Sequence, residues 1–110
     1  MWVKIDDGFA DHPKVVGLSD KAFRRHITAM CYAARHLTDG HIPPPIAGSD
    51  KATRELVAAG IWDTNGTGYS IHDYLAYQPT RDEVEERRKA RAEAGRRGGL
   101  AKARNRLANA

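Results

Sequence analysis

The clearest periodic pattern in the chain lies between Ser19 and Leu37. Apolar side chains recur there at intervals of three and four residues, at Phe23, Ile27, Met30, Ala34 and Leu37. This spacing places them on one face of an α-helix. Ser19 is a favourable N-cap and Thr38-Asp39-Gly40 a stop signal, so the pattern predicts a helix over 19–37 whose apolar face lies in the core.

A shorter helix is predicted to begin at Ser49 or Asp50, because either side chain can accept hydrogen bonds from the first-turn amides. Its apolar face consists of residues at helical spacing, Ala52, Leu56 and Ala59. It ends at Gly60, where the chain can adopt a positive φ. Two strand-like runs then predict a β-hairpin, with strands over 61–64 and 69–72 and a turn at Asn65-Gly66-Thr67-Gly68.

The remaining segments before residue 80 give weaker patterns. Alternating residues over 1–6 predict a short strand, and 41–43 a short extended piece. Between that piece and the second helix, Pro43-Pro44-Pro45 is locked by its rings and Ile46-Ala47-Gly48 is too short for more than one helical turn. After the hairpin, an aromatic and aliphatic cluster is expected to close the core over Ile71, formed by Tyr74, Leu75 and Tyr77.

Beyond residue 79 the composition changes. Thr80 can cap a further helix, with Glu83 at the reciprocal position of a capping box. From there to about Ala94 nearly every residue is charged or alanine, and Val84 is the single large apolar side chain. Gly95–Gly99 is expected to break this helix before a last short one over 100–107.

A helix followed directly by a hairpin is the second half of a winged helix, in which the helix enters the DNA major groove and the hairpin lies on the backbone. The predicted fold class is therefore α+β, a winged helix-turn-helix over residues 1–79, with a basic helical tail over 80–110. The alternative is a general α+β domain whose helix only packs on its hairpin, since fold alone does not determine function.

Charge is distributed unevenly along the chain. The 110 residues carry a net charge of +4, but residues 1–80 hold eight Lys/Arg against nine Asp/Glu, whereas residues 81–110 hold ten against five. Attraction for a polyanion is therefore concentrated in the tail. The best phosphate-contacting candidates are its arginines, Arg87, Arg88, Arg91, Arg96 and Arg97; the alternative is a charged helix in contact only with solvent.

Two further groups of residues are candidates for DNA contact. On the second helix the residues expected to face outward are Lys51, Thr53, Arg54 and Glu55, among which Arg can read guanine and Lys can bind phosphate. The alternative is a solvated face with an Asp50–Arg54 pair. At the hairpin, Thr64, Asn65 and Thr67 can donate to phosphates, although no Lys or Arg lies in the turn.

The sequence gives little support for catalysis or metal binding. Cys31, His36 and His41 are neighbours in sequence but lack the paired spacing of zinc ligands. Cys31 is instead expected to be a small buried residue. His72-Asp73 has no accompanying nucleophile motif, and adjacent strand residues point to opposite faces. We therefore expect no enzyme activity, no metal and no cofactor.

Several short segments together resemble the phage replisome-organiser, or DnaD-like, N-terminal domains of actinobacterial phages and prophages. The matching segments are Trp2–Asp6, His12–Val15, His36–Pro43, Leu56–Trp62, Ile71–Tyr74, Gln78–Arg81 and Gly95–Gly99. The resemblance implies a winged-helix domain that binds DNA or self-associates at a replication origin. Pro43–Gly48 is shorter than the usual second helix of these domains.

The expected function is non-catalytic binding of double-stranded DNA, in replication initiation or regulation. The alternative is a protein-interaction module that forms a homo-oligomer, or captures a replication or host protein, through its wing or tail. No apolar run approaches the ~20 residues needed to span a bilayer, and a single cysteine fits a reducing cytoplasm.

Overall fold

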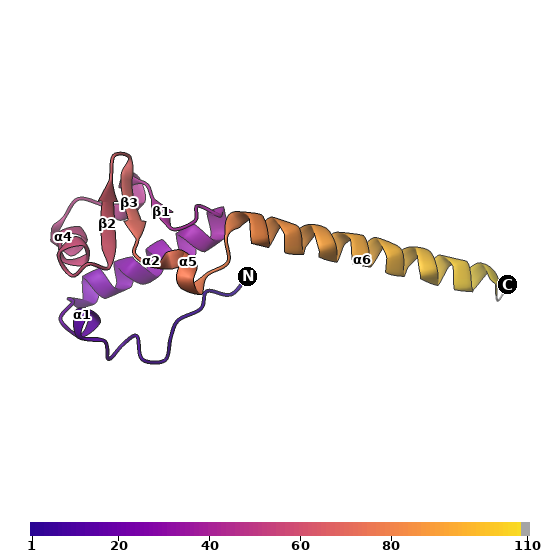
Figure 1. The fold of residues 1–110 in the computed structure, drawn as a ribbon, viewed down its shortest axis with the longest axis horizontal. Helices are drawn as coiled ribbons and strands as arrows, with labels where there is room; N and C mark the ends of the chain where they lie inside the picture. Colours follow the sequence, from indigo (N-terminus) through magenta and orange to yellow (C-terminus); the bar gives the residue numbers. More distant parts are fainter. Residues whose placement is uncertain (109–110) are drawn as a thin grey trace. The chain divides into compact units, whose positions relative to one another are not determined.

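The computed structural model describes residues 1–108 and has two compact units, Met1–Pro79 and a second unit from Thr80 onward. The first unit is a mixed α+β domain, as predicted, and the second is a long helix (Figure 1). In chain order the elements are α1 (Pro13–Val16), α2 (Asp20–His36), β1 (His41–Ile42), α3 (Pro44–Ala47), α4 (Lys51–Ala58), β2 (Trp62–Asn65), β3 (Gly68–Ile71), α5 (Tyr74–Tyr77) and α6 (Arg81–Ala108).

The sheet is a small antiparallel one with strand order β1-β3-β2. The hairpin pairs Trp62 with Ile71 at its base and Asn65 with Gly68 at its tip, and β1 pairs Ile42 with Tyr69. Gly68 has φ 144°, and a Cβ there would lie 2.6 Å from the Ile42 carbonyl oxygen, so only glycine fits the close approach of β1. The predicted hairpin and the short extended piece before it are both confirmed.

Helix α2 is confirmed with Ser19 as its N-cap, but its buried face differs from the predicted one. Phe23 and Ile27 are only half-buried. The residues buried along α2 are Ala22, His26, Ala29, Met30, Ala33 and Ala34. Small side chains let the neighbouring elements pack close to the helix, so the face is rotated toward the alanines, while Phe23 packs against Phe9 with ring centroids 5.9 Å apart.

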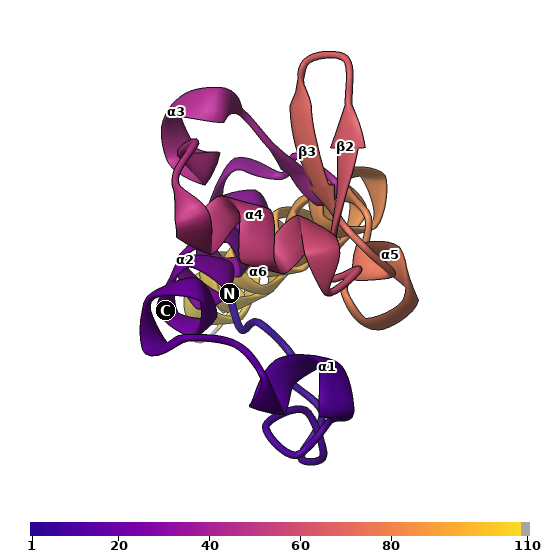
Figure 2. The same cartoon turned by 90° about the vertical axis from the view of Figure 1, so that its left-hand side faces the viewer.

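The core lies where α2, α4 and the sheet meet, and the largest fully buried side chains there are Trp62, Ile42 and Leu56. Figure 2 shows α4 beside the base of the hairpin, whose tip points away from α4 and α5. Tyr74 is buried against this core, close to Gly40 in the loop after α2. Gly40 has φ 92°, and a Cβ added to it would lie 2.7 Å from the Cβ of Tyr74.

Three local expectations for the first unit are wrong. Residues 1–6 form no strand, because Lys4 makes its backbone hydrogen bonds with the side chain of Gln78, at 3.1 and 2.6 Å, instead of with a neighbouring strand. Of the predicted aromatic cluster only Tyr74 is buried, while Leu75 and Tyr77 are exposed on the short helix α5. Cys31 is exposed as well.

Helix α6 begins with the predicted Thr80 cap, since the Glu83 amide donates to Thr80 Oγ1 at 3.1 Å. Glu83 Oε1 accepts from the Thr80 hydroxyl at 3.2 Å, whereas in a full capping box it would accept from the Thr80 amide. The expected break at Gly95–Gly99 is wrong, since the helix continues to Ala108. Each glycine makes the helix less stable by about 1 kcal/mol relative to alanine, but good helix formers flank the three glycines. Glu93 also pairs with Arg96 and Arg97 across the same turns, which stabilises the helix there. No helix in the described part of the chain combines the length and apolarity needed to cross a bilayer.

The rotated face of α2 predicts an unequal response to enlarged side chains. Ala33→Leu introduces three carbons into a fully buried position and should destabilise the protein by about 1–3 kcal/mol. Thr28→Leu, on the exposed face of the same helix, should change stability by about 0.5 kcal/mol or less. Urea unfolding of both variants measures the difference, and equal losses would contradict the observed packing.

Candidate nucleic-acid interface

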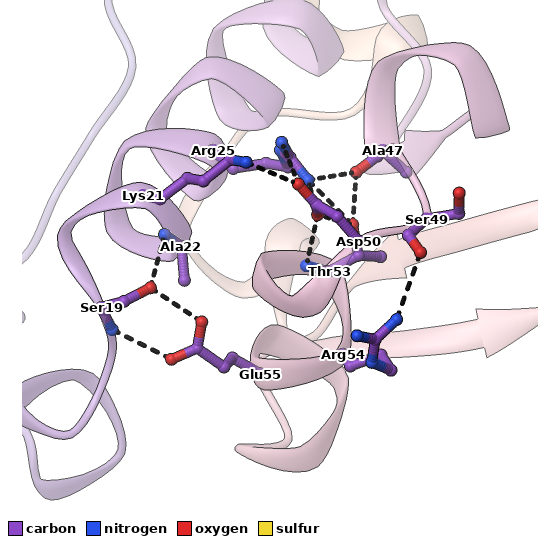
Figure 3. A network of polar contacts seen from close by, with 10 residues as sticks. All are labelled: Ser19, Lys21, Ala22, Arg25, Ala47, Ser49, Asp50, Thr53, Arg54 and Glu55. Atoms are coloured by element: carbon purple, nitrogen blue, oxygen red, sulfur yellow. Dashed lines mark hydrogen bonds and ion pairs between the residues drawn. The ribbon is translucent and has the colours of Figure 1, made fainter.

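The position of α4 is set by one carboxylate at its first turn (Figure 3). Asp50 is the N-cap of α4 and accepts from the Thr53 amide at 3.3 Å. The same carboxylate binds both terminal nitrogens of Arg25 on α2, with Arg25 Nη2 at 3.1 Å from Asp50 Oδ2, and Lys21 Nζ lies 2.9 Å from Asp50 Oδ2. These hydrogen bonds and the two cations hold the pKa of Asp50 far below its usual range.

The polar contacts of Arg25 extend to α3 through Ala47 and Thr53. Arg25 Nη1 donates to the Ala47 carbonyl at 3.3 Å and to Thr53 Oγ1 at 3.0 Å, and Thr53 Oγ1 donates to the Ala47 carbonyl at 2.8 Å. Thr53 is only 1% exposed. The expectation that Thr53 faces DNA is therefore wrong: its hydroxyl fastens the end of α3 to the start of α4.

A second contact between helices α2 and α4 involves Glu55 and the N-cap of α2. Ser19 Oγ donates to Glu55 Oε2 at 2.7 Å, and the Ser19 amide donates to Glu55 Oε1 at 3.2 Å. The pKa of Glu55 is lowered by these hydrogen bonds. Glu55 therefore serves the packing of the two helices, and the outward-facing residues of α4 that remain as DNA candidates are Lys51 and Arg54.

Lys51 and Arg54 are both exposed near the start of α4. Arg54 Nη1 donates to the Ser49 carbonyl at 3.3 Å. The proposed Asp50–Arg54 pair does not match the observed contacts, because Asp50 bonds to Arg25 and Lys21 on the other side of the helix. Two cationic side chains on one exposed helix surface are suited to contact phosphates and base edges.

The hairpin turn is organised by Asn65. Its Oδ1 accepts from the Thr67 amide at 3.1 Å and from Thr67 Oγ1 at 3.2 Å, and its Nδ2 lies 3.3 Å from His41 Nδ1. Both Asn65 and Thr67 remain exposed, as predicted. A hollow of about 540 Å³ opens between the hairpin and α3 and is lined by uncharged residues, among them Pro44, Gly48 and Asn65.

On α6 all five predicted tail arginines are exposed, but their surroundings differ. Arg96 and Arg97 both contact Glu93 Oε1, at 3.3 and 3.4 Å, and part of their charge is thereby neutralised. No ion-pair partner lies within reach of Arg87, Arg88 or Arg91 among residues 1–108. These three arginines are the stronger phosphate candidates of the tail.

A buried polar pair that the sequence analysis missed lies beneath the hairpin. The Trp62 indole N–H donates to His26 Nδ1 at 3.0 Å, and both side chains are almost fully buried. Burial lowers the pKa of His26 to about 4, so its ring is neutral at neutral pH. His26 also lines a hollow of about 340 Å³ beside α1. The helical spacing of Ala22, His26, Ala29 and Ala33 was the signal that could have placed His26 in the core.

His72 lies between two carboxylates at the hairpin base. Its Nδ1 is 2.9 Å from Asp63 Oδ2 and its Nε2 is 3.4 Å from Asp73 Oδ2. The hydrogen bond with Asp63 and the charge of Asp73 raise the pKa of His72. Within residues 1–108 no group of three or more potential metal ligands lies close together. These exposed contacts hold the His72 ring between two acidic side chains and become ion pairs when the ring is protonated.

Comparison of the chain with protein-family models, with curated proteins and with solved structures found no match.

The Arg25 contacts predict a specific stability difference between adjacent arginines. Arg25→Gln removes the charged hydrogen bonds to Asp50 and should destabilise the protein by about 1–3 kcal/mol. Arg24→Gln makes the same charge change at an exposed position and should cost about 0.5 kcal/mol or less. Guanidinium chloride unfolding distinguishes them, and an equal effect of the two substitutions would argue against the Arg25 contacts.

The lowered pKa of His26 predicts acid sensitivity. Because the pKa of His26 is about 4 in the folded protein and 6.5 in an exposed imidazole, the unfolded chain binds more protons between these values, and stability falls as pH decreases through that window. Between these pH values the free energy of unfolding falls by about 1.4 kcal/mol per pH unit, on the order of 3 kcal/mol in all. Unfolding should be measured at pH 4.5, 5.5, 6.5 and 7.5.

The control is His26→Gln, whose amide oxygen can still accept from the Trp62 indole but does not titrate. The difference in stability between the wild type and this variant should shrink as pH falls from 6.5. His72 acts in the opposite direction, because its raised pKa stabilises the fold at low pH, but its contribution is common to both proteins. A difference that is constant with pH would contradict the role of His26.

Proposed function

We propose that residues 1–79 are a winged helix-turn-helix domain that binds double-stranded DNA without catalysis. The observation that carries the proposal is the order helix–strand–helix–helix–strand–strand from α2 to β3, with β1 beside β3 in the sheet. In winged-helix domains the same order places the third helix and the hairpin on the DNA-binding side. Here α4 occupies the position of that third helix.

The surface of α4 has side chains suited to this role. Lys51 and Arg54 are exposed, whereas Asp50, Thr53 and Glu55 are occupied with holding the helix in place. A rigidly held helix can present Arg54 to a guanine edge and Lys51 to a phosphate at little further cost in conformational entropy. At the hairpin, Asn65 and Thr67 remain the candidate backbone contacts.

The tail supplies the electrostatic part of the proposal. The first unit is nearly neutral, and α6 exposes most of the positive charge of the chain. Cationic side chains that replace counterions on DNA give binding that is largely independent of sequence. A nearly neutral domain that recognises bases and a basic helix that binds phosphates together fit a DNA-binding protein. The resemblance to DnaD-like domains implies a cytoplasmic phage or prophage protein acting in replication initiation or regulation.

An apolar surface favours a second candidate function, self-association. Trp2 is 92% exposed and Tyr77 is 61% exposed, and the Lys4–Gln78 hydrogen bonds tie the N-terminal segment beside α5. Exposed aromatic side chains of this kind are enriched in protein interfaces. A homo-oligomer, or a complex with a replication or host protein, would cover them.

The proposal predicts separate effects for the two cations of α4. Arg54→Ala should cost about 1–3 kcal/mol of binding free energy and relax specificity at one base pair. Lys51→Ala should weaken binding to all sequences and lower the salt slope by about 1. Fluorescence anisotropy with duplex DNA from the flanks of the gene, over a salt series, measures both quantities.

Arg24→Ala on α2 is the matched control, because it removes an exposed arginine from a helix that is not proposed to enter the groove. It should leave affinity and specificity unchanged. Light scattering on the same samples reports the mass of the protein. Self-association without any affinity for DNA would replace the DNA-binding proposal with the second candidate.

A further inference from the structure

The continuous helix α6 sorts its charges onto different faces. At about 100° per residue, six basic residues fall within roughly 60° of the direction of Val84, and no acidic residue of the helix does. The six are Arg81, Arg87, Arg88, Arg91, Lys102 and Arg106. The rest of the circumference holds four basic and five acidic residues, so the net charge of +5 of the tail lies on roughly one third of the helix surface.

This sector, which we call the basic face, has a bare centre. All the glycines within α6, Gly95, Gly98 and Gly99, fall on it between the basic residues. Nothing lies within 4 Å of the Cβ position at any of the three. The basic face therefore consists of an arginine cluster (Arg87, Arg88, Arg91), an uncovered stretch of backbone, and a second cluster (Lys102, Arg106).

We propose that the basic face of α6 docks in the major groove of double-stranded DNA, with the two clusters on the phosphates of opposite strands. This inference rests on the proposed DNA-binding function and assigns a specific surface to it. An α-helix fits the major groove, whose width is about 12 Å. Arg91 and Lys102 are separated by eleven residues, or about 16 Å of helix, so the two clusters can reach the phosphate rows on either side.

The glycines fit this geometry because a helix crossing a groove approaches the DNA most closely at its centre. Side chains there would hold the helix away from the floor of the groove, whereas glycine allows close backbone approach. The opposite faces complete the argument, since Asp82, Glu83, Glu86 and Glu93 would be repelled by phosphate. Only the setting with the basic face toward DNA therefore presents positive side chains without acidic ones among them.

Two other polyanions, duplex RNA and an acidic protein, fit the basic face less well than duplex DNA. The major groove of duplex RNA is deep and narrow and does not admit a helix. An acidic protein would be expected to offer apolar contacts as well, but the basic face carries only one large apolar side chain, Val84, and that side chain is buried. Duplex DNA is the occupant that matches both the charge and the bare centre.

The test compares two triple variants of the full chain that change the net charge equally. Arg87→Gln, Arg91→Gln and Arg106→Gln remove three charges from the basic face, whereas Arg96→Gln, Arg97→Gln and Arg104→Gln remove three from the remaining surface. Fluorescence anisotropy with a labelled DNA duplex over a salt series gives the affinity and its salt slope. Circular dichroism checks that both variants keep their helix content.

The first triple variant should weaken binding at least tenfold and lower the salt slope by about 2–3, because each phosphate contact contributes about 0.9. The second should change the slope by less than about 1. As a single substitution in the wild type, Gly98→Leu should weaken DNA binding, because the new side chain lies at the centre of the basic face. Ala101→Leu, off the basic face, should leave the affinity unchanged.

Equal losses for the two triple variants would show diffuse attraction and overturn the assigned face while leaving DNA binding intact. Undiminished binding of Gly98→Leu, or equal binding of duplex RNA by the wild type, would overturn groove docking. A wild-type protein without affinity for DNA would overturn the proposed function itself, together with this inference.

Discussion

The contact between Arg25 and Asp50 determines the geometry of the first unit. Asp50 caps α4 and binds the guanidinium of α2, so a single carboxylate fixes both where α4 begins and how it lies on the longest helix of that unit. Arg25 also donates to the Ala47 carbonyl at the end of α3. Charge-assisted hydrogen bonds of this kind are directional as well as strong. Without them the short helix α4, of eight residues, would be oriented by its buried side chains and by the contact of Glu55 with Ser19.

Under the proposed function, specificity and affinity are divided between the two units of the chain. The first unit holds a helix whose capping and anchoring groups are occupied, so few side chains remain for contact with a partner. The second unit exposes a row of cations on a helix with little to bury. For a DNA-binding protein this division is physically useful, because phosphate contacts supply attraction that is independent of sequence while a rigid helix supplies discrimination between bases. The same division also makes the two contributions separable by mutation.

The candidate site was only partly predictable because exposure depends on neighbouring elements. Lys51, Arg54, Asn65 and Thr67 were expected to be exposed and are. Thr53 was assigned to the same surface from its place on α4, but α3 and Arg25 cover it, and a helical pattern does not show which polar residue a neighbouring element will cover. On α6 the sequence identified the arginines, but their common face appeared only once the helix proved continuous through Gly95–Gly99.

Local signals in the sequence determined the α+β class, the N-caps at Ser19 and Thr80, the hairpin and the long helix α2, because these depend on neighbours a few residues away. For α4 they left Ser49 and Asp50 as alternative caps, and the structure has Asp50. Tertiary structure decided which face of α2 is buried and made His26 a core residue paired with Trp62, thirty-six positions later. It also left the N-terminal segment without a strand partner. Packing and long-range hydrogen bonds join side chains that are far apart in sequence, and the periodicity of one segment does not show which distant side chains it will contact.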